Sequence, residues 1–200
     1  MFERAIDEQL EQLRRVFAPG PYLDRRLGRA FAFQALYEMD QARHPPIDVL
    51  QRLAEAIGDC PEAAYPSEVL RSATNYAREL VTGVLERRST IDRLIHERAP
   101  LWPLAQMSAV DRNVLRLGLY ESLYGNATVP LRTAINEAVE LAKLFGSETS
   151  AKFVNGVLGR AVEANASADA PAADPTSSLR APGVPATSTG ERGLDDGHER

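Results

Sequence analysis

The sequence of 200 residues has little of what secreted, membrane or disulfide-bonded proteins need. It has one cysteine, Cys60, so no disulfide can form within the chain. No apolar run approaches the roughly 18 residues of a membrane span. The acidic start MFERAIDEQLEQ lacks the apolar core of a secretory signal. We therefore expect a cytoplasmic protein with no membrane segment.

Motifs that carry enzymatic chemistry are also missing. The sequence contains no G-x-S-x-G, H-E-x-x-H, C-x-x-C, Walker A or G-x-G-x-x-G pattern, and its three histidines lie far apart. Asp59 and Glu62 lie close to Cys60 in the sequence and disfavour a reactive thiolate. His96 is interpreted as a partly exposed residue near a helix end. We expect no catalysis, no cofactor, no metal and no small-molecule substrate.

The charge balance restricts any nucleic-acid site to a local patch. The formal net charge is −5, from 23 Lys and Arg against 28 Asp and Glu, so the surface as a whole is not built to bind phosphate. Residues 164–200 are dominated by Pro, Gly, Ser, Thr and Ala. Such a segment buries too little apolar area to offset its chain entropy, and we predict a disordered tail there.

The rest of the chain shows helical periodicity and almost no strand signal. The spacing predicts an amphipathic helix over 2–17, in an N-terminal extension of residues 1–21, and an all-α domain over 22–163. Proline, glycine and capping residues set the helix ends. In the domain, helices are expected from Asp24 to His44, over 47–57, from Ser67 to Pro100 as one helix or two in tandem, from Ser108, from Pro130 to Gly146, and from Ser147. The total is about seven helices.

Two segments have the composition of an RNA site. Arg25, Arg26 and Arg29 fall within about 100° of helical arc and form a basic corner. Three large side chains follow along the same side: Phe33, Leu36 and Tyr37. Arginine beside aromatic groups suits single-stranded RNA, but a solvated arginine face over an ordinary core has the same spacing. The second segment, SAKFVNG at 150–156, combines a cation, an aromatic and an amide at a helix start.

Three longer segments, taken in order, resemble a known family. RRLGRAFAFQALYEMD, VDRNVLRLGLYES and VPLRTAINEAVELAKLFGSETSAKFVNGVLGRA are similar to the N-terminal, middle and C-terminal signatures of the NusB family of bacterial transcription antitermination factors. The resemblance covers residues 25 to about 162. It implies an all-helical fold of two small subdomains, without catalysis.

The resemblance also implies partners. Members of the family bind the boxA element of ribosomal RNA leader transcripts together with the ribosomal protein NusE, in a complex that helps RNA polymerase read through terminators. Carried onto this sequence, the RNA contacts are Arg25, Arg26, Arg29, Lys152 and Phe153.

The NusE contacts implied by the resemblance are Tyr37 and Asp111. Asp111 also completes an S-x-x-D capping box with Ser108, and both roles are compatible because a cap uses only part of the carboxylate. Three further signature residues are interpreted as helix–helix hydrogen-bonding groups: Asn136, Glu137 and Asn155.

Two alternatives to an RNA-binding adaptor remain. A NusB-like domain also precedes the catalytic domain of some RNA cytosine methyltransferases, but only residues 164–200 follow the domain here. The other alternative is a protein scaffold that has lost RNA binding, which the acidic balance would suit. The N-terminal helix and the tail are additions to the family pattern, and the helix is placed to cover part of an RNA face.

Overall fold

The computed structural model describes residues 20–42, 44–45, 49, 65–125 and 129–168. These residues form six helices and no strand, which confirms the predicted all-α fold. The helices are α2 (Leu23–Ala42), α4 (Ser67–Glu86), α5 (Arg88–Arg98), α6 (Ala109–Leu123), α7 (Leu131–Phe145) and α8 (Ser150–Ala168). The helices expected over 2–17 and 47–57, Cys60 and residues 169–200 lie outside the described residues.

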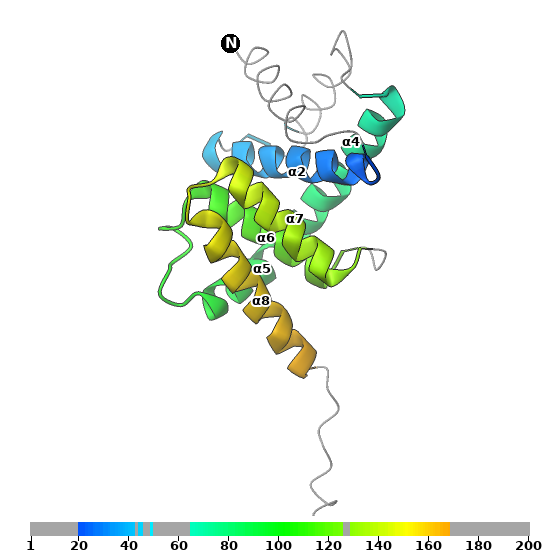
Figure 1. The fold of residues 1–200 in the computed structure, drawn as a ribbon. Coiled ribbons are helices and arrows are strands. Elements are labelled where there is room, and N and C mark those ends of the chain that lie inside the picture. The colour runs from blue at the N-terminus through cyan, green and yellow to red at the C-terminus, as the bar shows by residue number, and fades with distance from the viewer. Residues whose placement is uncertain (1–19, 43, 46–48, 50–64, 126–128, 169–200) are drawn as a thin grey trace, which may run out of the picture. The chain divides into compact units, whose positions relative to one another are not determined.

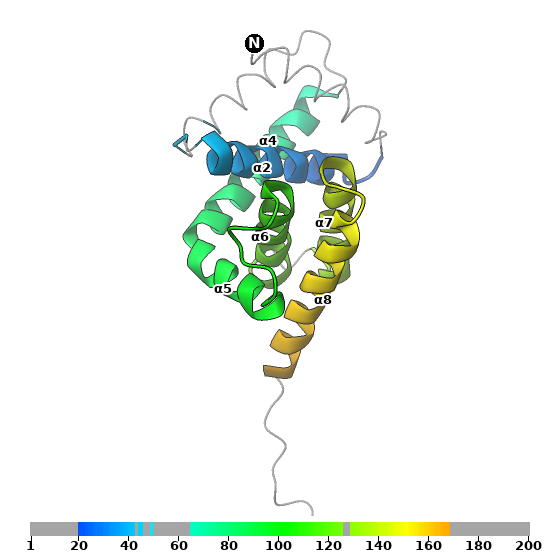
Figure 2. The ribbon, with the colours of Figure 1, turned by 90° about the vertical axis from the view of Figure 1, so that its left-hand side faces the viewer.

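Helix α6 is the centre of the fold. It contacts each of the other five described helices, and all its residues from Asn113 to Glu121 are buried. Figures 1 and 2 show α2 lying across the ends of α6 and α7, with α4 crossing it and α5 and α8 below. A helix buried on every side must satisfy its polar side chains internally. Two groups of helices, α2 with α4 and α5 to α8, therefore share one core through α6.

The apolar periodicity of residues 67–98 gives two helices in tandem that break at Arg87. Ala77, Leu80, Ile91 and Ile95, which recur with this period, are each at most 1% exposed. These positions confirm that the 3.6-residue period identified the buried face.

The expected helix starts are partly correct. The Ser108 Oγ accepts a hydrogen bond from the Asp111 backbone N–H at 2.9 Å, which confirms Ser108 as the N-cap of α6. The helix expected from Asp24 is present, but it begins one residue earlier at Leu23, so Asp24 is not its N-cap. The Asp24 carboxylate instead accepts a hydrogen bond from the Ser72 hydroxyl at 2.6 Å and so joins α2 to α4.

The turn between α7 and α8 depends on Gly146, which ends α7 as expected. Its φ is −99°, which is not the left-handed conformation of a C-terminal glycine. A Cβ there would lie 2.5 Å from the Ala142 carbonyl oxygen, so the glycine permits a close approach. The Ser147 N–H donates to the Ser150 Oγ at 2.9 Å, which fixes the start of α8.

Helix α8 is longer than predicted. It continues to Ala168, past Glu163, where the tail was expected to begin. The residues between are ANASA, and alanine has the highest helix propensity. Within the described residues, no helix is both long and apolar enough to cross a membrane.

Candidate nucleic-acid interface

The three arginines of the predicted basic corner lie in three different environments. The Arg29 side chain is 4% exposed. Its Nε donates to Glu121 Oε2 of α6 at 2.8 Å, and its Nη2 donates to Glu121 Oε1 at 2.6 Å. Arg29 is therefore an interior residue, and the expectation that its guanidinium faces a ligand in solvent is wrong.

The Arg29 ion pair belongs to a cluster that joins four helices. The Tyr76 hydroxyl of α4 donates to the same Glu121 carboxylate, and Glu137 of α7 lies 3.7 Å from Arg29 Nη1. Burial and the charge of Glu121 raise the pKa of Tyr76 far above its ordinary value. Burial alone would lower the pKa of Arg29, but the hydrogen bond and charge of Glu121 outweigh it, and the net shift is upward.

Arg25 and Arg26 lie closer to the surface. The Arg25 guanidinium carbon is 4.1 Å from the centre of the Tyr76 ring, a cation–π contact that holds a half-buried side chain. The Arg26 side chain is 47% exposed and its Nε lies 3.2 Å from Glu137 Oε1. Arg26 is thus the most accessible cation of the three.

The aromatic side of α2 divides between core and surface. Phe33 and Leu36 are 3% and 4% exposed, so the core interpretation holds for both. The Phe33 ring stacks on Phe145 of α7 with centres 4.6 Å apart. Tyr37 lies 6.0 Å from Phe33 and is 39% exposed, which leaves its outer edge open to a partner.

Lys152 and Phe153 stand in the first turn of α8. Lys152 is exposed and makes no ion pair within the part of the chain that the structure describes. Phe153 is half-buried, and its ring forms a T-shaped pair with Trp102, from the loop between α5 and α6, at 5.8 Å between centres. The predicted combination of a cation and an aromatic ring is therefore present at this helix start, and Trp102 adds a second ring to it.

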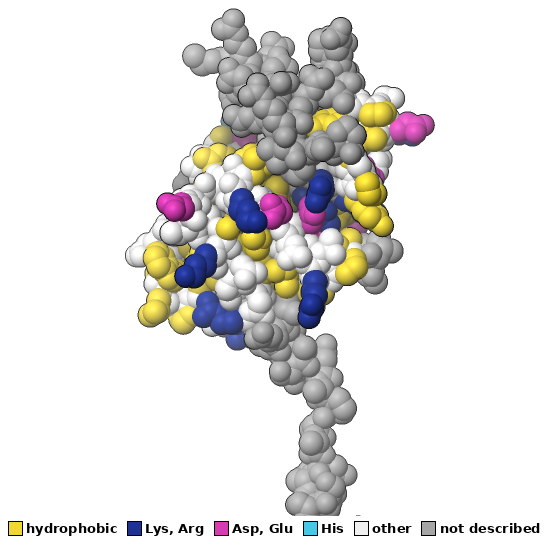
Figure 3. All heavy atoms as spheres, in the orientation of Figure 1, with side chains coloured by type: hydrophobic (Ala, Val, Ile, Leu, Met, Phe, Trp, Pro, Cys, Tyr) yellow, Lys and Arg dark blue, Asp and Glu magenta, His cyan; other side chains and the backbone are white. Residues whose placement is uncertain are grey.

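The surface that carries α7 and α8 bears scattered Lys and Arg groups (Figure 3). The exposed cations of α7 and α8 are Arg132, Lys143, Lys152 and Arg160, and Arg26 of α2 is exposed as well. Two of them have acidic partners: Arg26 pairs with Glu137, and Lys143 lies 2.7 Å from Glu140. The other three form no ion pair with a described residue, so their charges are available to an anionic ligand.

The structure separates the two predicted RNA segments along α2. Arg26 of α2 pairs with Glu137 in the middle of α7, whereas Phe33 stacks on Phe145 at its end, close in sequence to Lys152. A helix rises about 1.5 Å per residue, so the distance from Arg26 to Tyr37 along α2 is roughly 16 Å. The arginine end of α2 and its Tyr37 end are therefore well separated.

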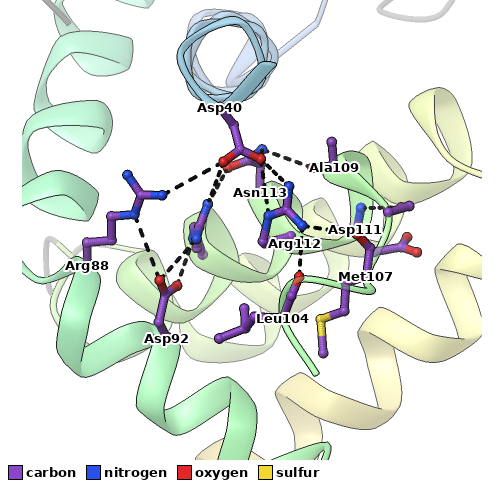
Figure 4. Close-up of polar contacts among 11 residues, drawn as sticks. Asp40, Arg88, Asp92, Leu104, Met107, Ala109, Asp111, Arg112 and Asn113 are labelled. Atoms are coloured by element: carbon purple, nitrogen blue, oxygen red, sulfur yellow. Dashed lines mark hydrogen bonds and ion pairs between the residues drawn. The ribbon is translucent and has the colours of Figure 1, made fainter. Parts of the chain in front are cut away.

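The predicted NusE contacts adjoin one polar network. Asp40 lies one helical turn beyond Tyr37, and Asp111 precedes Arg112 in the chain. The Arg112 Nε donates to Asp40 Oδ2 at 3.1 Å, as Figure 4 shows. The contact between Arg112 and Asp40 thus joins the sequence neighbours of Asp111 and Tyr37, which lie far apart in the chain.

Only one of the two hydrogen bonds of the expected Ser108–Asp111 capping box forms. Its backbone N–H is capped by Ser108, but its carboxylate accepts no hydrogen bond from a described residue, and its Oδ1 is buried. A buried carboxylate oxygen without a donor is costly in a folded protein. The Asp111 Oδ1 is therefore left without a hydrogen bond from any described residue.

The polar network centres on Asp40 (Figure 4). Asn113 Nδ2 lies 3.3 Å from its Oδ2, and Arg116 Nη1 lies 3.5 Å from its Oδ1. Arg116 also donates from Nε to Asp92 of α5 at 2.8 Å. Burial alone would raise the pKa of Asp40, but the hydrogen bond and charge of Arg112, aided by Arg116, lower it below its ordinary value.

Sequence reasoning did not identify Trp102 or the partners of Arg29. Trp102 stands between Pro100 and Pro103, and an aromatic residue in a segment bounded by prolines was the available signal. Glu121 gave no local signal, because it lies 92 residues from Arg29 in the chain.

The three further signature residues behave differently. Glu137 forms the predicted link between helices, to Arg26 of α2. Asn136 and Asn155 are exposed and form no side-chain hydrogen bond with another described residue, so for them that interpretation is wrong. Asn155 stands three residues after Lys152 on α8, where its amide is open to solvent.

Comparison with known proteins gives consistent matches. The sequence model of the NusB family matches residues 26–163. Transcription antitermination protein NusB of Roseiflexus sp. (strain RS-1) is 45% identical over 139 residues, which cover 69% of this chain and 91% of that protein.

Solved structures share the fold. The structure of T. maritima NusB is 38% identical, with a TM-score of 0.58 over 70% of this chain and 90% of that chain. A chain from a crystal structure of antitermination factors NusB and NusE in complex with double-stranded RNA is 26% identical, with a TM-score of 0.60 over 70% of this chain and 97% of that one.

Proposed function

The chain belongs to the NusB family, and from this premise we propose that it is a transcription antitermination factor. In this proposal it is a cytoplasmic, non-enzymatic adaptor that binds boxA-type single-stranded RNA of ribosomal RNA leader transcripts together with NusE. The bound complex promotes read-through by RNA polymerase. The similar chain solved with NusE and double-stranded RNA supports NusE and RNA as classes of partner.

The observation that carries RNA binding is the start of α8. Lys152 is an exposed cation without an ion pair among the described residues, next to the half-buried ring of Phe153. A free ammonium attracts phosphate, and an aromatic ring stacks an unpaired base. We assign the RNA contacts to Lys152, Phe153, Arg26 and Arg25.

Arg29 has an indirect role in this proposal. Its bidentate pair with Glu121 and its approach to Glu137 fix the arginine end of α2 against α6 and α7. Because Glu137 also pairs with Arg26, the buried arginine positions the exposed one.

The proposed NusE surface consists of Tyr37 and Asp111. Tyr37 offers an exposed aromatic edge, and Asp111 offers a carboxylate without a donor among the described residues. Tyrosines and desolvated charges of this kind are typical anchors of a protein interface. The Asp40 network holds both elements at a fixed separation.

The test is fluorescence anisotropy of a labelled boxA RNA titrated with the full-length protein at one salt concentration, with and without NusE. The controls are a scrambled strand and a duplex of the boxA sequence. We expect a preference for the boxA strand that becomes tighter with NusE. Equal and weak binding of all three RNAs in both conditions would contradict the proposal, and NusE binding without RNA preference would favour a protein scaffold.

A further inference from the structure

The loop between α5 and α6 presents two large apolar side chains to solvent. Leu101 is 88% exposed and Trp102 is 57% exposed. Burying a tryptophan provides the largest apolar area of any side chain, so leaving its ring in water forgoes that stabilisation. Neither residue is accounted for by the fold or by the contacts assigned above.

This loop is held in place by the polar network. The Arg112 Nη1 donates to the carbonyl oxygens of Leu104 at 2.8 Å and Met107 at 3.0 Å, and the same guanidinium is anchored by Asp40 of α2 (Figure 4). The Trp102 backbone N–H also donates to the Ala99 carbonyl oxygen at 2.9 Å. The indole is therefore presented from a fixed backbone, which lowers the entropy cost of engaging a ligand.

The exposed indole is not isolated. Its ring and the ring of Phe153 of α8 form a T-shaped pair, with centres 5.8 Å apart and planes at 61°. Lys152, the residue before Phe153, is exposed and has no ion pair with a described residue. Asn155 adds an exposed amide on the same helix, and the acid closest to them in the sequence is Glu148, which is exposed in the turn before α8.

We propose that Trp102 is an RNA-binding residue that stacks one unpaired base on the indole face that Phe153 leaves open, with the adjoining phosphate on Lys152. This inference rests on the proposed function and adds a second aromatic contact to it. A T-shaped pair leaves one indole face open to stacking, and every base has a π-face. The neighbouring free cation favours an anionic strand over an apolar protein segment.

Trp102 also provides a direct readout, because it is the sole tryptophan of the chain. A base stacked on the indole is expected to quench its fluorescence. We would titrate boxA RNA into the protein alone and into its mixture with NusE, with Trp102→Phe as the blank that contains no tryptophan. The expected result is quenching that saturates together with the anisotropy change.

Variants separate stacking from structural effects. Trp102→Ala should weaken boxA binding about tenfold or more, because a stacked aromatic contributes this much per base. Trp102→Phe should retain most of the affinity, and Leu101→Ala, which removes the more exposed neighbour, should leave it unchanged. The salt dependence of Trp102→Ala should match that of the wild type, because no phosphate contact is lost, and its helix content should be intact.

The outcomes distinguish this inference from the proposed function. Suppose that the wild type and Trp102→Ala bind boxA equally well in the presence of NusE, and that boxA does not change the fluorescence of the wild type. The inference then fails and the proposed function stands. If the wild type shows no boxA preference, both fail. If NusE quenches Trp102 in the absence of RNA, the indole is part of a protein interface and the inference is wrong.

Discussion

The guanidinium of Arg29 and the carboxylate of Glu121 form a bidentate ion pair between α2 and α6, with side chains only 4% and 2% exposed. Removing one partner of such a pair leaves an uncompensated buried charge. Arg29→Ala should therefore lower the free energy of unfolding by about 3–5 kcal/mol. The measurement is urea unfolding followed by circular dichroism at pH 7.

Arg26→Ala is the matched control for this prediction. Arg26 pairs with Glu137 but is 47% exposed, so its loss should cost less than about 1 kcal/mol. Equal and small losses in the two variants would show that the buried cluster does not hold α2 in place.

Lys152 should govern part of the salt dependence of RNA binding. Each phosphate neutralised on a single strand contributes about 0.7 to the slope of log affinity against log salt. Lys152→Ala should reduce that slope by this amount and weaken binding to all strands alike. Arg93→Ala removes an exposed cation of α5 that already pairs with Glu97, so it should leave the slope as it is. If Lys152→Ala leaves the slope unchanged, Lys152 does not contact a phosphate of the RNA.

Asp111 and Ser108 allow the capping and partner roles to be separated. Asp111→Asn keeps the backbone N–H that Ser108 caps, so stability should hold while NusE affinity falls about tenfold. Ser108→Ala should do the reverse, with a loss of about 1 kcal/mol in unfolding free energy and unchanged NusE affinity. Calorimetric titration with NusE and urea unfolding measure the two effects. A parallel loss in both variants would mean that Asp111 acts only through the helix end.

The fold was predictable because its signals are local. The apolar period of residues 67–98 and the Ser108 cap depend on neighbours within a turn or two, and the structure confirms both. Periodicity could not decide between one helix and two over residues 67–98, because the break at Arg87 depends on how α4 and α5 each pack on α6.

The site was less predictable because its geometry depends on distant partners. Arg26 and Arg29 share a helix face by spacing, yet one is accessible and the other is enclosed by Glu121 of α6. No pattern near Arg29 indicates that its partner lies 92 residues away. Trp102 escaped notice for a related reason, since an aromatic in a short loop is informative only once Phe153 is seen beside it.

Asp40 should make stability depend on acidity. Its pKa is lowered in the folded protein, chiefly by Arg112 against the opposing effect of burial. A carboxyl with a depressed folded pKa contributes stability that is fully present above its unfolded pKa of about 3.9 and is lost as the pH falls through the folded value. The difference in unfolding free energy between wild type and Asp40→Asn should thus be about 1–3 kcal/mol at pH 6 and shrink as the pH falls toward 3. Gln41→Ala, an exposed and non-titrating neighbour on α2, should differ from wild type by the same small amount at every pH. A wild-type advantage over Asp40→Asn that stays constant from pH 6 to pH 3 would show that the Asp40 charge does not stabilise the network.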